Sequence, residues 1–167
     1  MNIKLRPWQK NDLELLQQLA DNVHIYNYVR DRFPHPYTLK DAEEWLALNT
    51  GVNPTTNFVI EADGLFAGSI ALVTKEDIYR NNIEIGYWIA EPFWNMGIAT
   101  KAIELICLFI KQHYKQVNRI YASVFESNKA SMRVLEKNGF ALESIHKNGI
   151  IKNNVLLDET IWVKFIF

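Results

Sequence analysis

A change in hydrophobic periodicity limits most strongly what this chain can fold into. Between residues 57 and 90 the apolar side chains recur with a period of two, and from residue 97 to 114 the apolar pattern becomes helical. Asp63-Gly64 interrupts the alternation with a typical two-residue hairpin turn. The pattern predicts a meander of three strands, over residues 57–62, 65–73 and 82–90, followed by a short loop and one long helix.

Capping residues and breakers divide the rest of the chain. Asn11 is predicted to cap the first helix, with Glu14 completing a capping box, and Thr38 is predicted to cap another helix. Asn128 opens a later helix, which Gly139 ends. The other expected elements are strands over residues 2–8 and 120–124 and helices over residues 11–22, 24–30, 38–51 and 128–138.

The closing strands complete an α+β pattern. Residues 140–147 and 155–165 are predicted strands, joined through Asn148-Gly149 and Asn153-Asn154. Strand runs mixed with a β-α-β-α segment indicate an α+β domain with a mostly antiparallel sheet. A chain of 167 residues with 49% hydrophobic and 22% charged residues fits one globular domain, so residues 1–167 are expected to form a single domain.

Charge and composition exclude several classes of protein. The net charge of −1 offers no basic surface for a phosphate backbone, so nucleic acid is not an expected partner. No apolar stretch is long enough to cross ~30 Å of lipid, so a cytoplasmic protein without a membrane partner is expected. The lone Cys107 is expected to pack within a helix. The four histidines lack metal-ligand spacing, so no metal is expected.

A carboxylate on the third predicted strand is the first candidate for chemistry. Period two places Glu84 on the same face as Gly86, Trp88 and Ala90. Gly86 leaves the strand surface open there, and a carboxylate at its edge can accept a proton directly or through water. The alternative is a strand glutamate that pairs with a surface lysine.

Two helix starts are the other candidates. Gly97 and Ala99 let an anion approach the backbone N–H groups at the start of the long helix, and Thr100 adds a hydroxyl. The alternative is that Gly97 only relieves a tight strand-to-helix connection. Asn128 occupies an N-cap position with Ser131 one turn later, so both polar groups can address one spot. The alternative is a capped amphipathic helix that merely tolerates Ser131.

Together the three segments resemble the GNAT acetyltransferases. Ile-Glu-Ile-Gly-Tyr-Trp-Ile, Trp-Asn-Met-Gly-Ile-Ala-Thr and the helix that begins Asn-Lys-Ala-Ser-Met-Arg occur in the order and spacing of that family. More narrowly the chain resembles the RimJ/RimL-type branch, whose members acetylate protein N-terminal amines. The resemblance implies a three-layer α+β fold whose sheet splits in a V around acetyl-CoA, between the strands matching residues 83–90 and 119–125.

The resemblance also implies roles for individual residues. Glu84 matches the general base, acting through water, and Ser131 matches the acid that protonates the departing CoA thiolate. Leu135 stands where many GNAT enzymes have a tyrosine acid, and Asn95 and Met96 replace the small and basic residues usual in the turn. The implied cofactor-binding residues are Trp88, Ile89 and Ala90 for the pantetheine arm, Met96, Gly97, Ile98, Ala99, Thr100 and Lys101 for the pyrophosphate, and Asn128 for the arm.

The acceptor is expected to be a primary amine that attacks directly in a ternary complex. At pH 7 roughly one-sixth of an α-amine of pKa ~7.7 is unprotonated, against about four parts in ten thousand of a lysine amine of pKa ~10.4. A modest base therefore favours a protein N-terminal α-amine. A polyamine or aminoglycoside acceptor and a CoA-binding module without turnover stay open as alternatives, as does a homodimer. Tyr37 and Trp94 are candidates for lining the acceptor pocket.

Overall fold

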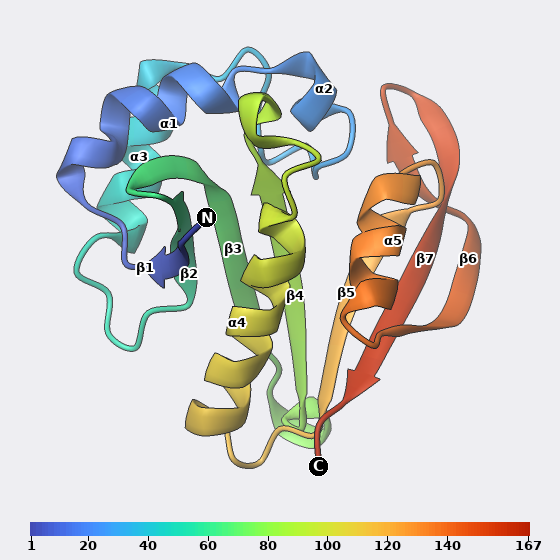
Figure 1. Ribbon diagram of the computed structural model, residues 1–167. Coiled ribbons are helices and arrows are strands. Elements are labelled where there is room, and N and C mark those ends of the chain that lie inside the picture. The colour runs from blue at the N-terminus through green and yellow to red at the C-terminus, as the bar shows by residue number, and fades with distance from the viewer. The chain divides into compact units, whose positions relative to one another are not determined.

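A seven-stranded mixed sheet is the framework of the computed structural model, which describes residues 1–167. The strands follow the order β1-β2-β3-β4-β5-β7-β6 (Figure 1). They are β1 (Ile3–Arg6), β2 (Asn57–Ala62), β3 (Leu65–Thr74), β4 (Asn82–Ile89), β5 (Arg119–Phe125), β6 (Ala141–Lys152) and β7 (Val155–Phe165). The pairs β1-β2, β2-β3, β5-β7 and β6-β7 are antiparallel and β4-β5 is parallel, which confirms the predicted α+β class.

Five α-helices and three short 3-10 turns connect the strands. The helices are α1 (Leu13–Ala20), α2 (Val23–Tyr26), α3 (Leu39–Asn49), α4 (Ile98–His113) and α5 (Lys129–Lys137), and the 3-10 turns are η1 (Lys10–Asp12), η2 (Asp77–Tyr79) and η3 (Glu91–Phe93). The chain divides into two compact units, residues 1–71 with 87–102 and residues 72–86 with 103–167. No helix is long and apolar enough to span a bilayer.

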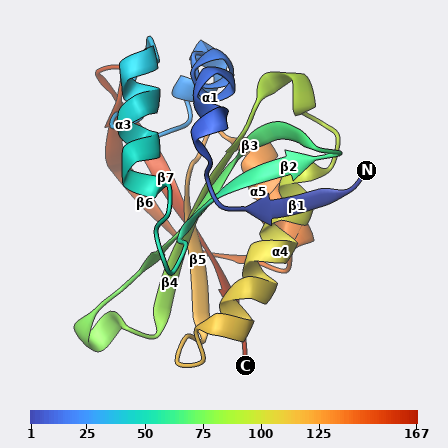
Figure 2. The same cartoon turned by 90° about the vertical axis from the view of Figure 1, so that its left-hand side faces the viewer.

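The first unit is built on an aromatic core. α1 and α3 lie side by side (Figure 2). The Trp8 ring packs edge-on against Trp45 at 5.9 Å between centroids and tilts against Phe66 at 5.6 Å. The buried residues of this core are Trp8, Leu16, Ala20, Tyr37, Ala42, Leu46, Val59 and Phe66.

The predicted cap of the first helix is wrong. The carboxylate of Asp12, not Glu14, accepts a hydrogen bond from the backbone N–H of Gln9 at 2.8 Å, and α1 begins only at Leu13. Arg6 explains the difference, since its guanidinium donates to both Asp12 oxygens at 2.7 and 2.9 Å and holds that carboxylate in a buried position. The ion pair of Asp12 with Arg6 on β1 therefore decides where the helix begins, in place of the predicted Asn11 cap.

The predicted cap of α3 is confirmed. Thr38 caps the helix, and its hydroxyl and backbone N–H both donate to Asp41. These contacts join residues three positions apart. They depend on no distant part of the chain, so the local pattern predicts them.

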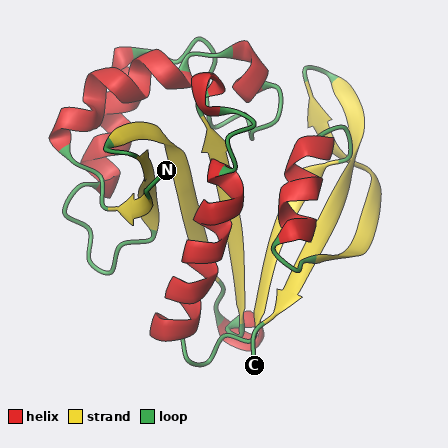
Figure 3. Ribbon diagram, viewed as in Figure 1, coloured by secondary structure: helices red, strands yellow, loops and turns green.

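The second unit carries the two long closing strands, and α5 lies in front of β5 and β7 (Figure 3). Asn148-Gly149 is not the turn that the sequence predicts, because β6 continues through it to Lys152 with a register shift between His146 and Ile150. The extra residues bulge out of the strand, and Asp158 on β7 holds them by accepting from the Asn148 N–H at 2.9 Å. The chain reverses at Asn153-Asn154, where both residues have positive φ.

Replacing Gly68 by alanine should strongly destabilise the fold. A Cβ at this position would lie 2.2 Å from the Trp88 carbonyl oxygen and 2.9 Å from the Ile89 Cα, and the residue has φ of +151°. Because both neighbours are backbone of β4, neither can move aside cheaply. We expect Gly68→Ala to cost about 3 kcal/mol in urea unfolding. Gly86→Ala is the matched control, since no atom lies within 4 Å of its Cβ position, and it should change stability by less than about 1 kcal/mol.

Candidate active site

Glu84 lies in an ion pair on β4 in the second unit. Its Oε2 accepts a hydrogen bond from Lys75 Nζ at 2.9 Å and lies 3.4 Å from the Tyr121 hydroxyl, and only 12% of its side chain is exposed. Partial burial lowers the pKa of Lys75, but the hydrogen bonds and charges of Glu84 and Tyr121 outweigh it, so that this pKa is raised overall. The surface-lysine alternative is therefore the arrangement found, and the carboxylate keeps a hydroxyl beside it through which a proton can pass.

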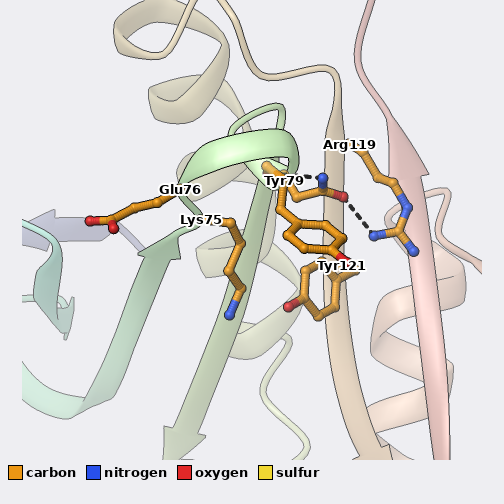
Figure 4. Close-up of a pocket in the computed structure, with 6 residues that line it drawn as sticks. Lys75, Glu76, Tyr79, Arg119 and Tyr121 are labelled. Atoms are coloured by element: carbon orange, nitrogen blue, oxygen red, sulfur yellow. Dashed lines mark hydrogen bonds between the residues drawn. The ribbon is translucent and has the colours of Figure 1, made fainter.

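A pocket that the sequence did not reveal adjoins this pair. It has a volume of about 230 Å³. Lys75 and Arg119 lie on opposite sides of Tyr121 (Figure 4), 5.6 Å and 5.1 Å from the centroid of its ring. Alternation along the strand places Arg119 and Tyr121 on one face. Their meeting with the end of β3 is a tertiary contact that no local pattern encodes. The lining residues are Lys75, Glu76, Tyr79, Asn82, Arg119 and Tyr121.

At the end of β4, in the first unit, the backbone N–H and C=O groups of successive residues point alternately toward β3 and away from it. The Ala90 N–H donates to the Ala67 carbonyl at 2.8 Å, and the Trp88 carbonyl lies against Gly68, so both residues direct their backbone toward β3. Ile89 faces the other way, and its carbonyl accepts from the Trp94 indole N–H at 2.7 Å. Of the three residues predicted to bind the pantetheine arm, Ile89 therefore has the N–H that points away from β3.

The turn before α4 has the backbone that an anionic cofactor needs. Asn95 and Gly97 both have positive φ, 62° and 76°, and nothing lies within 4 Å of a Cβ built on Gly97. Met96 is exposed, while Ile98 is buried and anchors the first helical turn. The N–H groups of Ile98, Ala99 and Thr100 come before the first i to i−4 bond of the helix, which Lys101 makes to Gly97 at 3.1 Å. This geometry fits a phosphate-bearing ligand.

Asn128 and Ser131 meet at the start of α5, in the second unit. The Asn128 side-chain oxygen accepts from the Ser131 backbone N–H at 3.1 Å, which confirms the predicted N-cap. The cap uses that oxygen and not the amide N–H groups, which can therefore donate elsewhere. Ser131 is half-buried.

The two predicted acceptor residues, both in the first unit, differ in exposure. Tyr37 is buried in the aromatic core 5.0 Å from the Phe33 ring. Burial, reinforced by the Asp41 charge, raises the pKa of Tyr37 to about 12, so its phenol stays protonated. Trp94 is 39% exposed, with its ring 6.5 Å from that of His24.

Cys107 is buried on α4, and burial raises the pKa of its thiol to about 11, with the Lys164 charge opposing the rise. A thiol that stays protonated at neutral pH is a poor nucleophile, so an acetyl-cysteine intermediate is disfavoured. No group of three or more His, Cys, Asp or Glu side chains could hold a metal ion.

Comparison with known proteins gives the family of this chain. Residues 2–141 match the model of the acetyltransferase (GNAT) domain. The chain therefore belongs to the GNAT acetyltransferase family and is an enzyme of that class. A spermidine N(1)-acetyltransferase from Escherichia coli K12 is 27% identical over 146 residues, covering 85% of this chain and 74% of that protein.

Two solved structures share the fold. The RimL ribosomal L7/L12 alpha-N-protein acetyltransferase in complex with coenzyme A has a TM-score of 0.87 and 20% identity, covering 99% of this chain and 95% of that chain. A spermidine N-acetyltransferase from Vibrio cholerae in complex with CoA and spermine has a TM-score of 0.79 and 22% identity, covering 98% and 95%. The neighbours include coenzyme A complexes and act on different amines.

Two replacements of Asn128 should separate its cap from any contact with the cofactor. Asn128→Ala removes the acceptor for the Ser131 N–H and should cost about 1 kcal/mol, a fall of about 2–4 °C in Tm. Asn128→Asp keeps an acceptor oxygen and should preserve Tm, but it replaces the amide donors by a negative charge. We expect this variant to raise the KM for acetyl-CoA. Unchanged KM in Asn128→Asp would limit Asn128 to a capping role.

Proposed function

We propose that this enzyme transfers the acetyl group of acetyl-CoA to the α-amine of a protein N-terminus. The amine attacks the thioester directly, in a ternary complex of enzyme, acetyl-CoA and acceptor, and residues 1–167 act as one domain. The observation that carries the proposal is the ion pair of Glu84 with Lys75 at 2.9 Å. A carboxylate that already accepts from an ammonium is a weaker base than a free one, because the neighbouring positive charge stabilises its ionised form. Such a base suits an amine that loses its proton readily.

Glu84 takes the proton of the acceptor in this proposal, through a water molecule. The Tyr121 hydroxyl at 3.4 Å supplies a second polar group that orients such a water beside the carboxylate. Lys75 places its positive charge 2.9 Å from this carboxylate. Because a carboxylate paired with an ammonium is a weak base, the reaction depends on the fraction of the acceptor amine that is unprotonated in solution. At neutral pH this fraction is far larger for an α-amine than for a lysine-like amine.

Backbone groups hold the cofactor in the proposed complex. The Ile89 N–H, which points away from β3, and the amide of Asn128 bind the pantetheine arm, while the N–H groups at the start of α4 bind the pyrophosphate. Acetyl-CoA supplies an activated thioester when bound. Residues 94–100 contain no basic side chain, so affinity for the phosphates comes from the backbone and from Lys101 on the first turn of α4.

Ser131 is the proposed acid for the departing thiolate. Its backbone N–H is fixed by Asn128, which holds the residue on the first turn of α5. Leu135, one turn later, is fully buried and has no proton to give. Ser131 is therefore the hydroxyl that α5 offers for this step.

Spermidine is the second candidate acceptor, because the Escherichia coli relative carries that name at 27% identity. A primary amine of the lysine type has pKa ~10.4 and is almost wholly protonated at pH 7. Acetylating it needs either a stronger base or a site that lowers the pKa of the amine.

Glu84→Gln should lower kcat for an N-terminal peptide by about 100-fold, the lower range for loss of a general base. Amide and carboxylate are similar in size, so the fold should be retained and the KM for acetyl-CoA should stay near its original value. Glu136→Gln on the exposed side of α5 is the matched control and should keep full activity. A kcat within threefold of the parent enzyme would remove Glu84 from the mechanism.

The pH dependence separates the two acceptors. With a peptide α-amine, kcat/KM should reach half of its plateau near pH ~7.7 and level off near pH 9, because the unprotonated amine is the reactive species and its pKa is ~7.7. With spermidine as the true acceptor the rise should continue beyond pH 9. Initial rates for one peptide and for spermidine between pH 6 and about 9.5 decide the matter, and efficient turnover of spermidine with no turnover of peptides would overturn the proposed acceptor.

A further inference from the structure

The pocket beside Glu84 has the chemistry of an anion site. Lys75 and Arg119 face its aromatic wall, the Tyr121 ring, from two sides, and Asn82 completes the polar lining. Glu76 is its one acidic lining residue, and its side chain extends away from the other labelled side chains in Figure 4. The volume of about 230 Å³ is several times the ~30 Å³ that a water molecule takes up in the liquid, so the pocket has room for a side chain.

The present partners of the two cations leave them able to bind another anion. Arg119 donates to the Asn82 side-chain oxygen at 2.8 Å and pairs with Glu143, whose side chain is 44% exposed. An exposed ion pair contributes little stability, so exchange of Glu143 for another carboxylate costs little. Lys75 has three N–H donors; it gives one to Glu84 and also interacts with Tyr121, so one N–H is left for a further acceptor.

We propose that this pocket is a subsite for an acidic side chain at the second or third position of the acceptor peptide. The inference rests on the proposed function, because it assumes that a peptide α-amine approaches Glu84. A carboxylate that enters the pocket on the Arg119 side of Tyr121 meets the planar guanidinium, which binds carboxylates with two parallel hydrogen bonds. The Lys75 ammonium adds positive charge from the other side of the ring. The enzyme would thus select N-termini followed by aspartate or glutamate.

The distances agree with an acidic side chain at the second or third position of the peptide. Lys75 Nζ is 2.9 Å from the Glu84 carboxylate, and the centroid of the Tyr121 ring lies 5.6 Å from Lys75 Nζ and 5.1 Å from the Arg119 guanidinium carbon. An extended peptide advances ~3.3–3.6 Å per residue. A peptide whose α-amine reaches Glu84 through water therefore carries its next one or two side chains past these cations.

The test is a set of peptides that differ in one side chain. Acetylation is measured for peptides with glutamate, glutamine or lysine at position 2 or position 3, in the parent enzyme, Arg119→Gln and Lys75→Met. In the parent enzyme the glutamate peptide should exceed the glutamine peptide about tenfold in kcat/KM, mainly through KM, and lysine should be the poorest. Arg119→Gln should bring the glutamate-to-glutamine ratio below about threefold, and Lys75→Met should also lower it.

The ratio guards against simple damage to the fold, because loss of folded enzyme lowers both rates equally. Arg119→Lys should retain part of the preference, since it keeps the charge but not the two-pronged donor. Lys137→Gln removes an exposed cation elsewhere in the same unit and should leave the ratio unchanged. Raising NaCl from 0.05 to 0.5 M should shrink the ratio in the parent enzyme, because salt screens exposed charges.

The outcomes separate the two proposals. Equal rates for glutamate and glutamine peptides, or a preference that Arg119→Gln retains, would overturn the subsite and leave the α-amine acceptor standing. Turnover of spermidine with no peptide acetylated would overturn both. A preference that disappears in Arg119→Gln and persists in Lys137→Gln would establish the subsite.

Discussion

The short parallel pairing of β4 with β5 is the constraint on which the candidate chemistry depends. It joins Asn82–Glu84 to Arg119–Tyr121 and ends there, although β4 continues to Ile89 and β5 to Phe125. Parallel strands cannot be joined by a hairpin, so a helical crossover, α4, must follow β4. The turn at Gly97 makes that connection, and the bond from the Lys101 N–H to the Gly97 carbonyl is the first i to i−4 bond of α4. One topological requirement therefore produces both the register of Glu84 with Tyr121 and the backbone turn before α4 that we propose binds the pyrophosphate.

The sequence predicts local features of this molecule better than distant ones. The hairpin at Asp63-Gly64 and the caps at Thr38 and Asn128 depend on residues at most three positions apart, and all occur as predicted. The cap at Asn11 fails because Arg6, on a strand, captures Asp12. In the same way β6 runs through Asn148-Gly149, since the Asn148 N–H donates to Asp158 on the neighbouring strand and holds the bulge.

In the candidate site, too, local features were predictable from the sequence and contacts between distant segments were not. Its residue types and spacing on β4, α4 and α5 are visible in the sequence, because each motif lies within one element or one turn. The partner of Glu84 was visible only as an unnamed alternative, since Lys75 comes from the end of β3. The pocket around Tyr121 was not visible at all. Three separate strand ends and a 3-10 turn build it, and no period in the sequence records which of them meet.

Pairing the proposed base, Glu84, with a lysine has a chemical cost and a chemical advantage. A neighbouring ammonium favours the ionised form of a carboxylate and so makes it a weaker base, and here the pair lies where only 12% of the Glu84 side chain is exposed. Without a neighbouring cation, burial would favour the protonated acid, which cannot accept a proton. The arrangement is therefore useful where the acceptor amine supplies its own unprotonated fraction, and of little use where a strongly basic amine must be stripped of its proton. In the proposed mechanism, Lys75 therefore sets the range of amines that Glu84 can serve.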